Sequence, residues 1–182
     1  MHRLREKYTK VIVPALKKEL KLNNVAMVPK ITKVVVNVGA GRALQDGKYL
    51  DTVADTVAKI TGQKPVKTLA RKSISNFKIR ANAPIGVKVT LRKDRMYDFI
   101  DKFVNVTLPR VHDFRGIPPK SVDGQGNLNI GIKEHIVFPE IKSTDLETIH
   151  GLEVTITTSA KDHNTGLQLL KAFGFPFQKS KA

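Results

Sequence analysis

Three segments of the chain alternate apolar and polar residues, so each predicts a β-strand with one buried and one polar face. A fourth, at 31–38, is rich in β-branched residues and lies between Pro29 and Gly39, which also predicts a strand. These segments are residues 31–38, 85–92, 127–132 and 152–157. Strands of a parallel sheet that helices cover on both sides are apolar throughout, so the alternation disfavours such a sheet. We expect an α+β fold with a mostly antiparallel sheet, helices packed on one face, and a polar, basic face left open.

Apolar residues at helical spacing predict the helices of this fold. Pro14 predicts a kink or a restart inside the first helix, and Asp94 is expected to cap the third. Residues 110–126 are rich in Gly, Pro and charge, so they are expected to form a long loop. The expected helices span residues 3–21, 48–60, 94–104 and 165–173.

The open face of the expected sheet carries amides, hydroxyls and cations. If Val34, Val36 and Val38 point into the core, their neighbours on the first strand point outward. Such side chains can contact ribose hydroxyls, base edges and phosphates together, which favours RNA over the alternative of a merely solvated face. The outward residues are Lys33, Val35, Asn37, Lys88, Thr90, Arg92, Asn127, Asn129, Thr155 and Thr157.

Charge supports a nucleic-acid partner. Residues 56–93 contain ten Lys and Arg residues and no Asp or Glu. The whole chain has 32 Lys and Arg against 16 Asp and Glu, a formal charge of +16. A polyanion is the partner that best relieves the repulsion within such a chain, and nucleic acid is the first candidate.

Several function classes find no support in the sequence. The chain has no Cys, and its five His residues lack metal-ligand spacing, so no metal site is expected. The glycines of 39–41 begin an incomplete dinucleotide-binding motif with Leu44 at the third position. Residues 41–48 resemble a phosphate loop that is one residue too long and is followed by Tyr49. We therefore expect no enzyme activity and no cofactor.

Length and hydropathy predict one domain, residues 1–182, in the cytoplasm. At 182 residues and 41% hydrophobic, the chain can bury one good core. It has no apolar run of about 18 residues, so no membrane span or signal peptide is expected. The expected domain carries a basic loop at about 71–84 besides the long loop at about 110–126.

The basic loop contains one aromatic residue, Phe77, among cations, and two interpretations remain open. In the first, residues 73–82 form a hairpin and Phe77 packs on the core, which is the more common fate of an aromatic residue at a strand position. In the second, Phe77 stacks on a base or a ribose. The cations that would then hold phosphates are Arg71, Lys72, Lys78 and Arg80.

Five stretches of the sequence resemble the L-five family of bacterial large-subunit ribosomal proteins, which bind 5S ribosomal RNA. The most specific is ITGQKPVKTLARKS at 60–73. The resemblance covers nearly the whole chain and implies a non-enzymatic protein of the central protuberance. The other stretches are residues 28–41, 108–116, 131–140 and 173–177.

The resemblance also implies partners and sites. The loop matching residues 71–84 is expected to contact the P-site transfer RNA. A segment around 110–149 is expected to bridge to the small-subunit head protein S-thirteen, and other large-subunit components are expected neighbours. By similarity, the contacts with 5S ribosomal RNA fall at Lys33, Asn37, Gly39, Gln63, Phe77 and Thr90.

Two other functions remain possible at this point. A free-standing RNA chaperone or regulatory RNA-binding protein would need the same basic face. A phosphate-handling enzyme using residues 39–48 is the weaker alternative. Co-sedimentation with large subunits in high salt separates the first from a ribosomal protein, and calorimetry with nucleotides tests the second.

Overall fold

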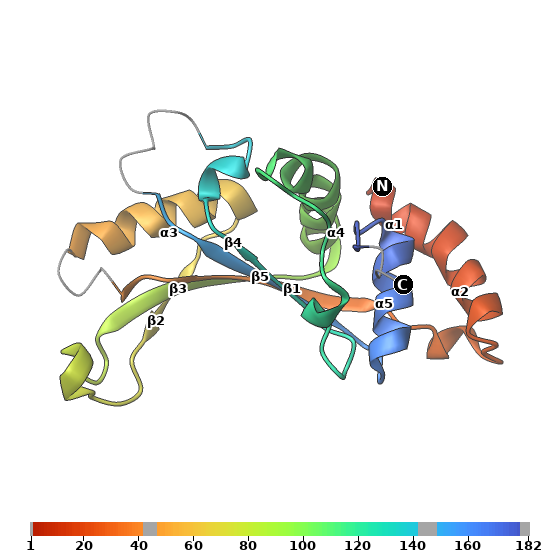
Figure 1. Ribbon diagram of the computed structural model, residues 1–182, viewed down its shortest axis with the longest axis horizontal. Helices are drawn as coiled ribbons and strands as arrows, with labels where there is room; N and C mark the ends of the chain where they lie inside the picture. The colour runs from red at the N-terminus through yellow and green to blue at the C-terminus, as the bar shows by residue number, and fades with distance from the viewer. Residues whose placement is uncertain (1, 42–46, 142–148, 179–182) are drawn as a thin grey trace. The chain divides into compact units, whose positions relative to one another are not determined.

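The computed structural model describes residues 2–41, 47–141 and 149–178, and it confirms the expected α+β fold. Its five strands form one antiparallel sheet in the order β2-β3-β1-β5-β4 (Figure 1). The chain divides into two compact units, which are described separately below. The first comprises Met1–Val34, Leu91–Ile130 and Thr155–Ala182, and the second comprises Val35–Thr90 and Gly131–Val154. The strands are β1 (Ile31–Gly39), β2 (Val66–Leu69), β3 (Pro84–Leu91), β4 (Leu128–Ile132) and β5 (Leu152–Thr158).

Burial along the strands follows the predicted alternation. On β1, Val34, Val36 and Val38 are buried, whereas the residues between them are partly exposed. The same period of two runs along β3 and β5. Burying alternate apolar side chains specifies the register, because a shift of one residue would expose all of them.

Strand β2 is the element that the sequence analysis missed. Three of its four residues are exposed, so burial gives no alternation to detect. It pairs only with β3, at the edge of the sheet, and the register shifts between Thr68 and Leu69. The signal that remained in the sequence was the pair of β-branched residues Val66 and Thr68 just after Pro65.

In the first unit, two helical stretches contain a π turn that ends two residues before a proline. Helix α1 (Arg3–Lys7) passes through η1 (Tyr8–Ile12) into α2 (Val13–Glu19), which contains Pro14. Helix α4 (Lys93–Lys102) passes through η5 (Phe103–Thr107) into η6 (Leu108–Arg110), which contains Pro109. A proline ring clashes with the carbonyl four residues earlier and has no N–H to bond to it, and a wider turn relieves that conflict. The predicted irregularity at Pro14 is confirmed.

The expected cap at Asp94 is wrong. Helix α4 begins at Lys93, and Arg92 occupies the cap position without a side-chain hydrogen bond. Asp94 lies in the first turn, where its carboxylate accepts a hydrogen bond of 2.6 Å from Arg5 of α1. Arg3 donates likewise to Asp101 at 2.8 Å, so α1 is fixed on α4 by ion pairs along one helix face.

The rest of the first unit is held by an aromatic cluster and by a close approach of two glycines. Tyr8, Tyr97 and Phe173 contact one another with ring centroids 5.5–6.4 Å apart. Gly166 of α5 (His163–Phe173) lies so close to Gly126 that a Cβ on Gly166 would stand 2.3 Å from the Gly126 Cα. Residues 110–126, expected as a long loop, contain after η6 the 3₁₀ turn η7 (Pro119–Ser121) and isolated β-bridges at Ile117 and Val122, but no strand or α-helix.

In the second unit, α3 (Gly47–Thr61) covers one side of its part of the sheet (Figure 1). Leu50, Val53, Val57 and Ile60 form its buried stripe, at the spacing predicted from the sequence. The other side of this part of the sheet has no helix among the residues described in the second unit. No helix in the described part of the chain is long and apolar enough to cross a membrane.

Two buried histidines stack in the second unit. The rings of His135, in η8 (His135–Val137), and His150 lie with centroids 4.2 Å apart. The backbone N–H of His150 donates to Nδ1 of His135 at 3.3 Å. Burial, and secondly the neighbouring His135, lower the pKa of His150 to about 4. With its pKa near 4, the His150 ring is neutral at neutral pH in the folded protein.

Candidate nucleic-acid interface

In the second unit, the side of the sheet away from α3 carries the polar residues that the sequence analysis predicted. Asn37 and Thr90 are half-buried and Lys88 is exposed, whereas Val36, Val87 and Val89 are buried on the opposite side. We call Asn37, Lys88 and Thr90, with their cross-strand neighbours, the open face. Register adds Val66 and Thr68 to it, because they pair with Lys88 and Gly86 and cross-strand partners share a face.

Gln63 adjoins the open face because of the way α3 ends. Gly62 has φ +65°, a left-handed conformation that terminates the helix, and its N–H donates to the carbonyl of Ala58. The chain then turns so that the side-chain amide of Gln63 donates to the Thr90 carbonyl at 3.3 Å. This bond fixes a half-buried amide beside Thr90, where it can also meet a ligand.

Gly39 lies at the end of β1, on the same side of the strand as Asn37. It is exposed, and a Cβ built there would have no atom within 4 Å. The fold therefore does not itself require glycine at this position. The open space around Gly39 leaves its backbone accessible to close approach by a ligand.

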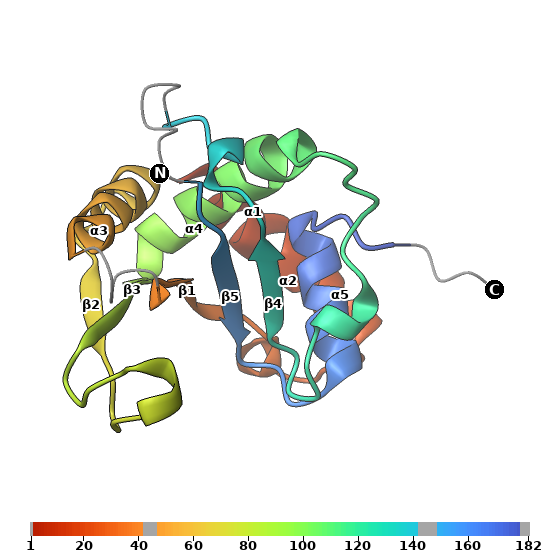
Figure 2. The ribbon, with the colours of Figure 1, turned by 60° about the vertical axis from the view of Figure 1, so that its left-hand side comes forward.

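The basic loop forms a structured end of the β2–β3 hairpin, residues 70–83, which we call the hairpin tip. Ile74 and Ile79 form an antiparallel bridge around the 3₁₀ turn η4 (Ser75–Phe77). Lys78 closes this turn with a left-handed φ of 54°. At the base, the Ala70 N–H donates to the carbonyl of Ala83. The hairpin tip extends away from α3 in both ribbon views (Figures 1 and 2).

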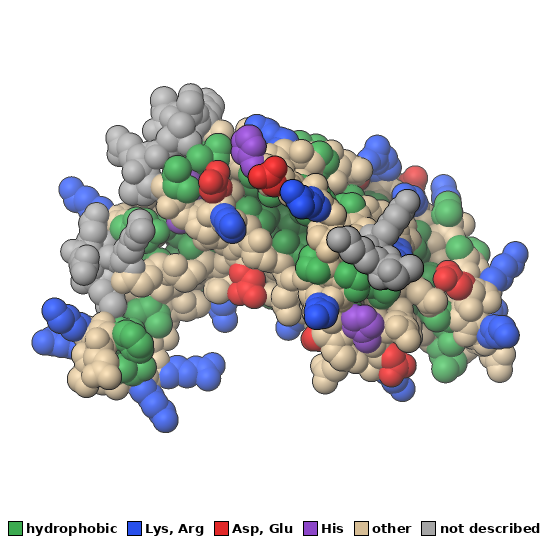
Figure 3. Space-filling view, in the orientation of Figure 1, with side chains coloured by type: hydrophobic (Ala, Val, Ile, Leu, Met, Phe, Trp, Pro, Cys, Tyr) green, Lys and Arg blue, Asp and Glu red, His purple; other side chains and the backbone are tan. Residues whose placement is uncertain are grey.

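The side chains of the hairpin tip point to solvent. Phe77 is 68% exposed and Ile74 is 44% exposed, so the interpretation in which Phe77 packs on the core is wrong. The turn η4 is responsible, because it takes Phe77 out of the strand position that would have directed it inward. Basic side chains project around apolar ones at this end of the molecule (Figure 3). The exposed cations are Arg71, Lys72, Lys78 and Arg80.

Several predicted residues belong to the first unit. Lys33 is half-buried on β1, and Arg92 is exposed between β3 and α4. The outward residues expected on the last two strands, Asn127, Asn129, Thr155 and Thr157, also lie in the first unit. The second unit contains Asn37, Gly39, Gln63, Phe77, Lys88 and Thr90. Sequence analysis missed Val66 and Thr68 on the open face, and Ile74 at the hairpin tip, because β2 and η4 were not predicted.

The cations at these positions have no carboxylate partners. Among the described residues, none of them forms an ion pair, whereas Arg3 and Arg5 of α1 are both paired with aspartates of α4. Unpaired cations beside exposed amides and hydroxyls form a surface suited to phosphates and ribose. The unpaired set is Lys33, Arg71, Lys72, Lys78, Arg80, Lys88 and Arg92.

Metal and phosphate-loop chemistry find no further support. The residues that the structure describes contain no group of three or more His, Cys, Asp or Glu side chains able to hold a metal ion. Of the phosphate-loop candidate at 41–48, positions 42–46 lie outside the described residues, including the Leu44 noted above.

Comparison with known proteins identifies the family. A model described as "Ribosomal protein L5" matches residues 24–80, and a second model, which describes the C-terminus of the same ribosomal family, matches residues 84–177. The chain is also 54% identical over 176 residues to the large ribosomal subunit protein uL5 of Halothermothrix orenii, which covers 97% of this chain and 98% of that protein. The chain therefore belongs to the ribosomal protein L5 family, uL5 of the large ribosomal subunit, whose members are structural and not enzymatic.

Proposed function

We propose that the chain binds 5S ribosomal RNA and helps to attach it in the central protuberance of the large subunit. It acts as a single 5S ribosomal RNA-binding domain, residues 1–182. The observation that carries this proposal is the open face, where Asn37, Thr90 and Gln63 present hydrogen-bonding groups beside the unpaired ammonium of Lys88. An RNA, unlike a generic polyanion, supplies ribose and base edges for the amides as well as phosphates for the lysine.

The proposed RNA-contacting residues form groups that bind different parts of the RNA. Asn37 and Gln63 can donate and accept hydrogen bonds, and the Thr90 hydroxyl suits a ribose edge. Lys88, with Lys33 and Arg92 of the first unit, neutralises phosphates. Gly39 admits a close backbone approach, and the exposed ring of Phe77 stacks on an unpaired base.

The cations of the hairpin tip serve a second RNA, the P-site transfer RNA. Arg71, Lys72, Lys78 and Arg80 stand at the end of the β2–β3 hairpin, which extends beyond α3, so they can reach a partner separate from the open face. Arginine and lysine there contact phosphates without reading sequence, as suits a site that must accept every transfer RNA.

A bridge to the small-subunit head protein S-thirteen completes the proposal. It uses the segment around 110–149, of which residues 142–148 lie outside the described part of the chain. The support for it is the family membership, and the described residues of the segment add exposed cations at Arg110, Arg115 and Lys133.

The test measures equilibrium binding of 5S ribosomal RNA to Asn37→Ala and Thr90→Val. Each should weaken binding by about 1–2 kcal/mol, the scale of a buried group that loses its partner. Asn164→Ala and Thr52→Val are matched controls on the exposed surfaces of α5 and α3 and should bind normally. If melting and circular dichroism are unchanged and the affinities are too, the open face is only solvated and the proposal fails.

A further inference from the structure

The first unit carries most of the positive charge of the chain, although the proposed 5S ribosomal RNA site uses little of it. This unit has 20 Lys and Arg against 8 Asp and Glu, a formal charge of +12, whereas the second unit has a formal charge of +4. The proposed site takes only Lys33 and Arg92 from the first unit. So large a basic excess outside that site indicates a further surface for a polyanion.

The excess is concentrated in residues 7–33, which span α2, η2 (Val25–Met27) and the start of β1. This stretch contains seven Lys and no Arg, and Glu19 is its only acidic residue. Ile12 and Leu16 are buried on the inner side of η1 and α2, so the lysines of these helices lie toward solvent. We call four of them the lysine cluster: Lys10, Lys17, Lys18 and Lys21.

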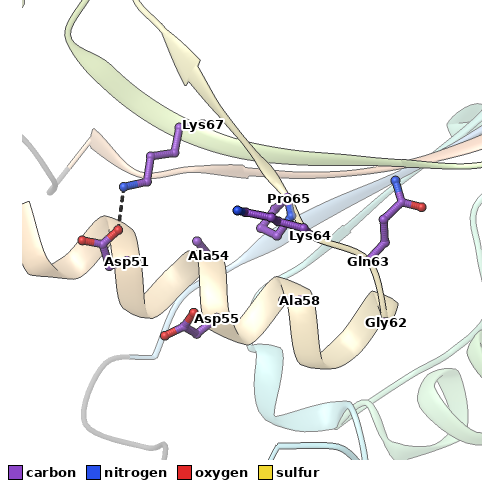
Figure 4. Close-up of a pocket in the computed structure, with 9 residues that line it drawn as sticks. All are labelled: Asp51, Ala54, Asp55, Ala58, Gly62, Gln63, Lys64, Pro65 and Lys67. Atoms are coloured by element: carbon purple, nitrogen blue, oxygen red, sulfur yellow. Dashed lines mark hydrogen bonds and ion pairs between the residues drawn. The ribbon is translucent and has the colours of Figure 1, made fainter.

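The charge of the lysine cluster is not compensated within the protein. None of its lysines forms an ion pair with a described residue, whereas Arg3 and Arg5 of α1 are paired with aspartates of α4. Basic side chains project from the end of the first unit formed by α1 and α2 (Figure 3). By contrast, the charges that line the pocket between α3 and β2 are balanced, and Asp51 there is paired with Lys67 (Figure 4).

The backbone of Lys21 gives a second, independent observation. The Leu22 N–H donates to the Lys17 carbonyl at 3.0 Å, and the Lys21 N–H donates to the Lys18 carbonyl at 3.3 Å. This pattern ends a helix with one left-handed residue, which is usually glycine. Lys21 takes that conformation with φ 51°, although a side chain there is strained. The helix dipole favours cations near this end, but it does not require lysine at the left-handed position.

Left-handed lysines recur elsewhere in the described chain. Five described residues other than glycine have a positive φ, and three of them are lysines: Lys21, Lys78 and Lys93. Asparagine and aspartate, the residue types that tolerate this conformation best, supply the other two. Lys78 belongs to the hairpin tip, for which an RNA partner is proposed above. Strain of this kind at Lys21 therefore supports a role for its ammonium group beyond folding.

We propose that the lysine cluster binds the phosphate backbone of an RNA duplex, separate from the 5S ribosomal RNA that the proposed function places on the open face. Lysine contacts phosphates as a point charge and does not read bases. Tyr8 is the only aromatic residue of 7–33, and its ring contacts Tyr97 and Phe173. No ring of this stretch is therefore free to stack on unpaired bases, which favours a duplex over a single strand.

A second RNA contact also suits a protein that attaches one RNA to a larger particle, because attachment requires two surfaces. The chain belongs to a family of large-subunit ribosomal proteins, so RNA is the polyanion that surrounds it. Val11 and Met27, near the lysine cluster in sequence, are 58% and 65% exposed. Basic helices with exposed apolar residues can also bind anionic membranes, so the test includes vesicles.

The test titrates an unbulged RNA duplex of about 16 base pairs into the full-length protein at several salt concentrations. Combining Lys18→Gln with Lys21→Gln should reduce the magnitude of the slope of log K against log salt by about 1.4–1.8, the share of two phosphate contacts. Lys120→Gln combined with Arg95→Gln removes two exposed cations of the same unit outside the lysine cluster and should leave the slope unchanged. Equal slopes for the two double variants would overturn the proposal.

Lys21→Gly separates RNA binding from folding, because the two make opposite demands on this position. Glycine relieves the left-handed strain, so Tm should rise by about 2–4 °C. The affinity for the duplex should fall as much as in Lys21→Gln, because both variants lose the same ammonium group. A lower Tm together with an unchanged duplex affinity would show that Lys21 serves folding and would overturn the proposal.

Competition shows whether the lysine cluster is a separate site. The duplex should still bind when 5S ribosomal RNA saturates the protein, and Asn37→Ala should leave duplex binding unchanged. Displacement of the duplex by 5S ribosomal RNA would assign the lysine cluster to the 5S site instead. Binding to phosphatidylserine vesicles that needs the lysine cluster, without such a need in duplex binding, would assign it to a membrane. Loss of 5S binding alone would contradict only the proposed function.

Discussion

Replacing Phe77 with alanine separates packing from RNA binding, because the two make opposite demands on its ring. Fully burying a Phe side chain contributes about 1.5–3 kcal/mol. Phe77 is 68% exposed, so only about one third of its side chain is buried. Burial of that third contributes less than about 1 kcal/mol to the free energy of unfolding. Stacking of one base on an aromatic ring is worth about 1–3 kcal/mol, or about 5- to 150-fold in affinity. Phe77→Ala should therefore cost more in 5S ribosomal RNA binding than in stability.

Urea denaturation measures the first quantity, and equilibrium titration with 5S ribosomal RNA measures the second. Phe138→Ala is the contrasting variant: Phe138 is 0% exposed, and its truncation should cost about 3–5 kcal/mol of stability. A loss of stability for Phe77→Ala on the scale of Phe138→Ala would show that Phe77 packs on the core after all. Unchanged stability together with unchanged affinity would show that the exposed ring has no part in RNA binding.

Two further predictions concern the hairpin tip and the buried histidines. Arg71→Ala combined with Arg80→Ala should speed transfer RNA dissociation from assembled ribosomes more than it lowers 5S ribosomal RNA occupancy in their large subunits. The reverse pattern would show that the hairpin tip binds 5S ribosomal RNA instead. The pKa of His150 lies near 4 when folded and returns to about 6.5 on unfolding, so the unfolded chain binds more protons between these values. Stability should fall by about 2 kcal/mol from pH 7 to pH 5 in urea titrations, and His150→Phe should remove that share of the slope. An unchanged slope in that variant would show that His150 does not titrate on unfolding.

The sheet could be predicted because its apolar periodicity is set by burial on one side. Val34, Val36 and Val38 are buried as the alternation required, and the stripe of α3 follows in the same way. β2 could not be found by that rule, because an edge strand exposed on both faces has no buried side to impose a period. The sequence also identified the polar side of β1 and β3 correctly, since the side that is not core must be polar.

The predictions that were wrong concern features that depend on local backbone geometry and on contacts between residues distant in sequence. Whether Phe77 points inward depends on the turn η4, which directs it to solvent. Asp94 has the chemistry of a helix cap, but its carboxylate is bonded to Arg5, 89 positions away. The pairing of β2 with β3 is likewise not revealed by short-range patterns.

Salt dependence of 5S ribosomal RNA binding is the most direct test of the central claim, because phosphate contacts by unpaired cations release counterions. With about five phosphates neutralised, the slope of log K against log salt should be about −3.5 to −4.5. Lys88→Gln should reduce the magnitude of that slope by about 0.7–0.9, the share of one contact. A nearly flat slope for the unmodified protein, or an unaltered slope for Lys88→Gln, would contradict binding through the open face.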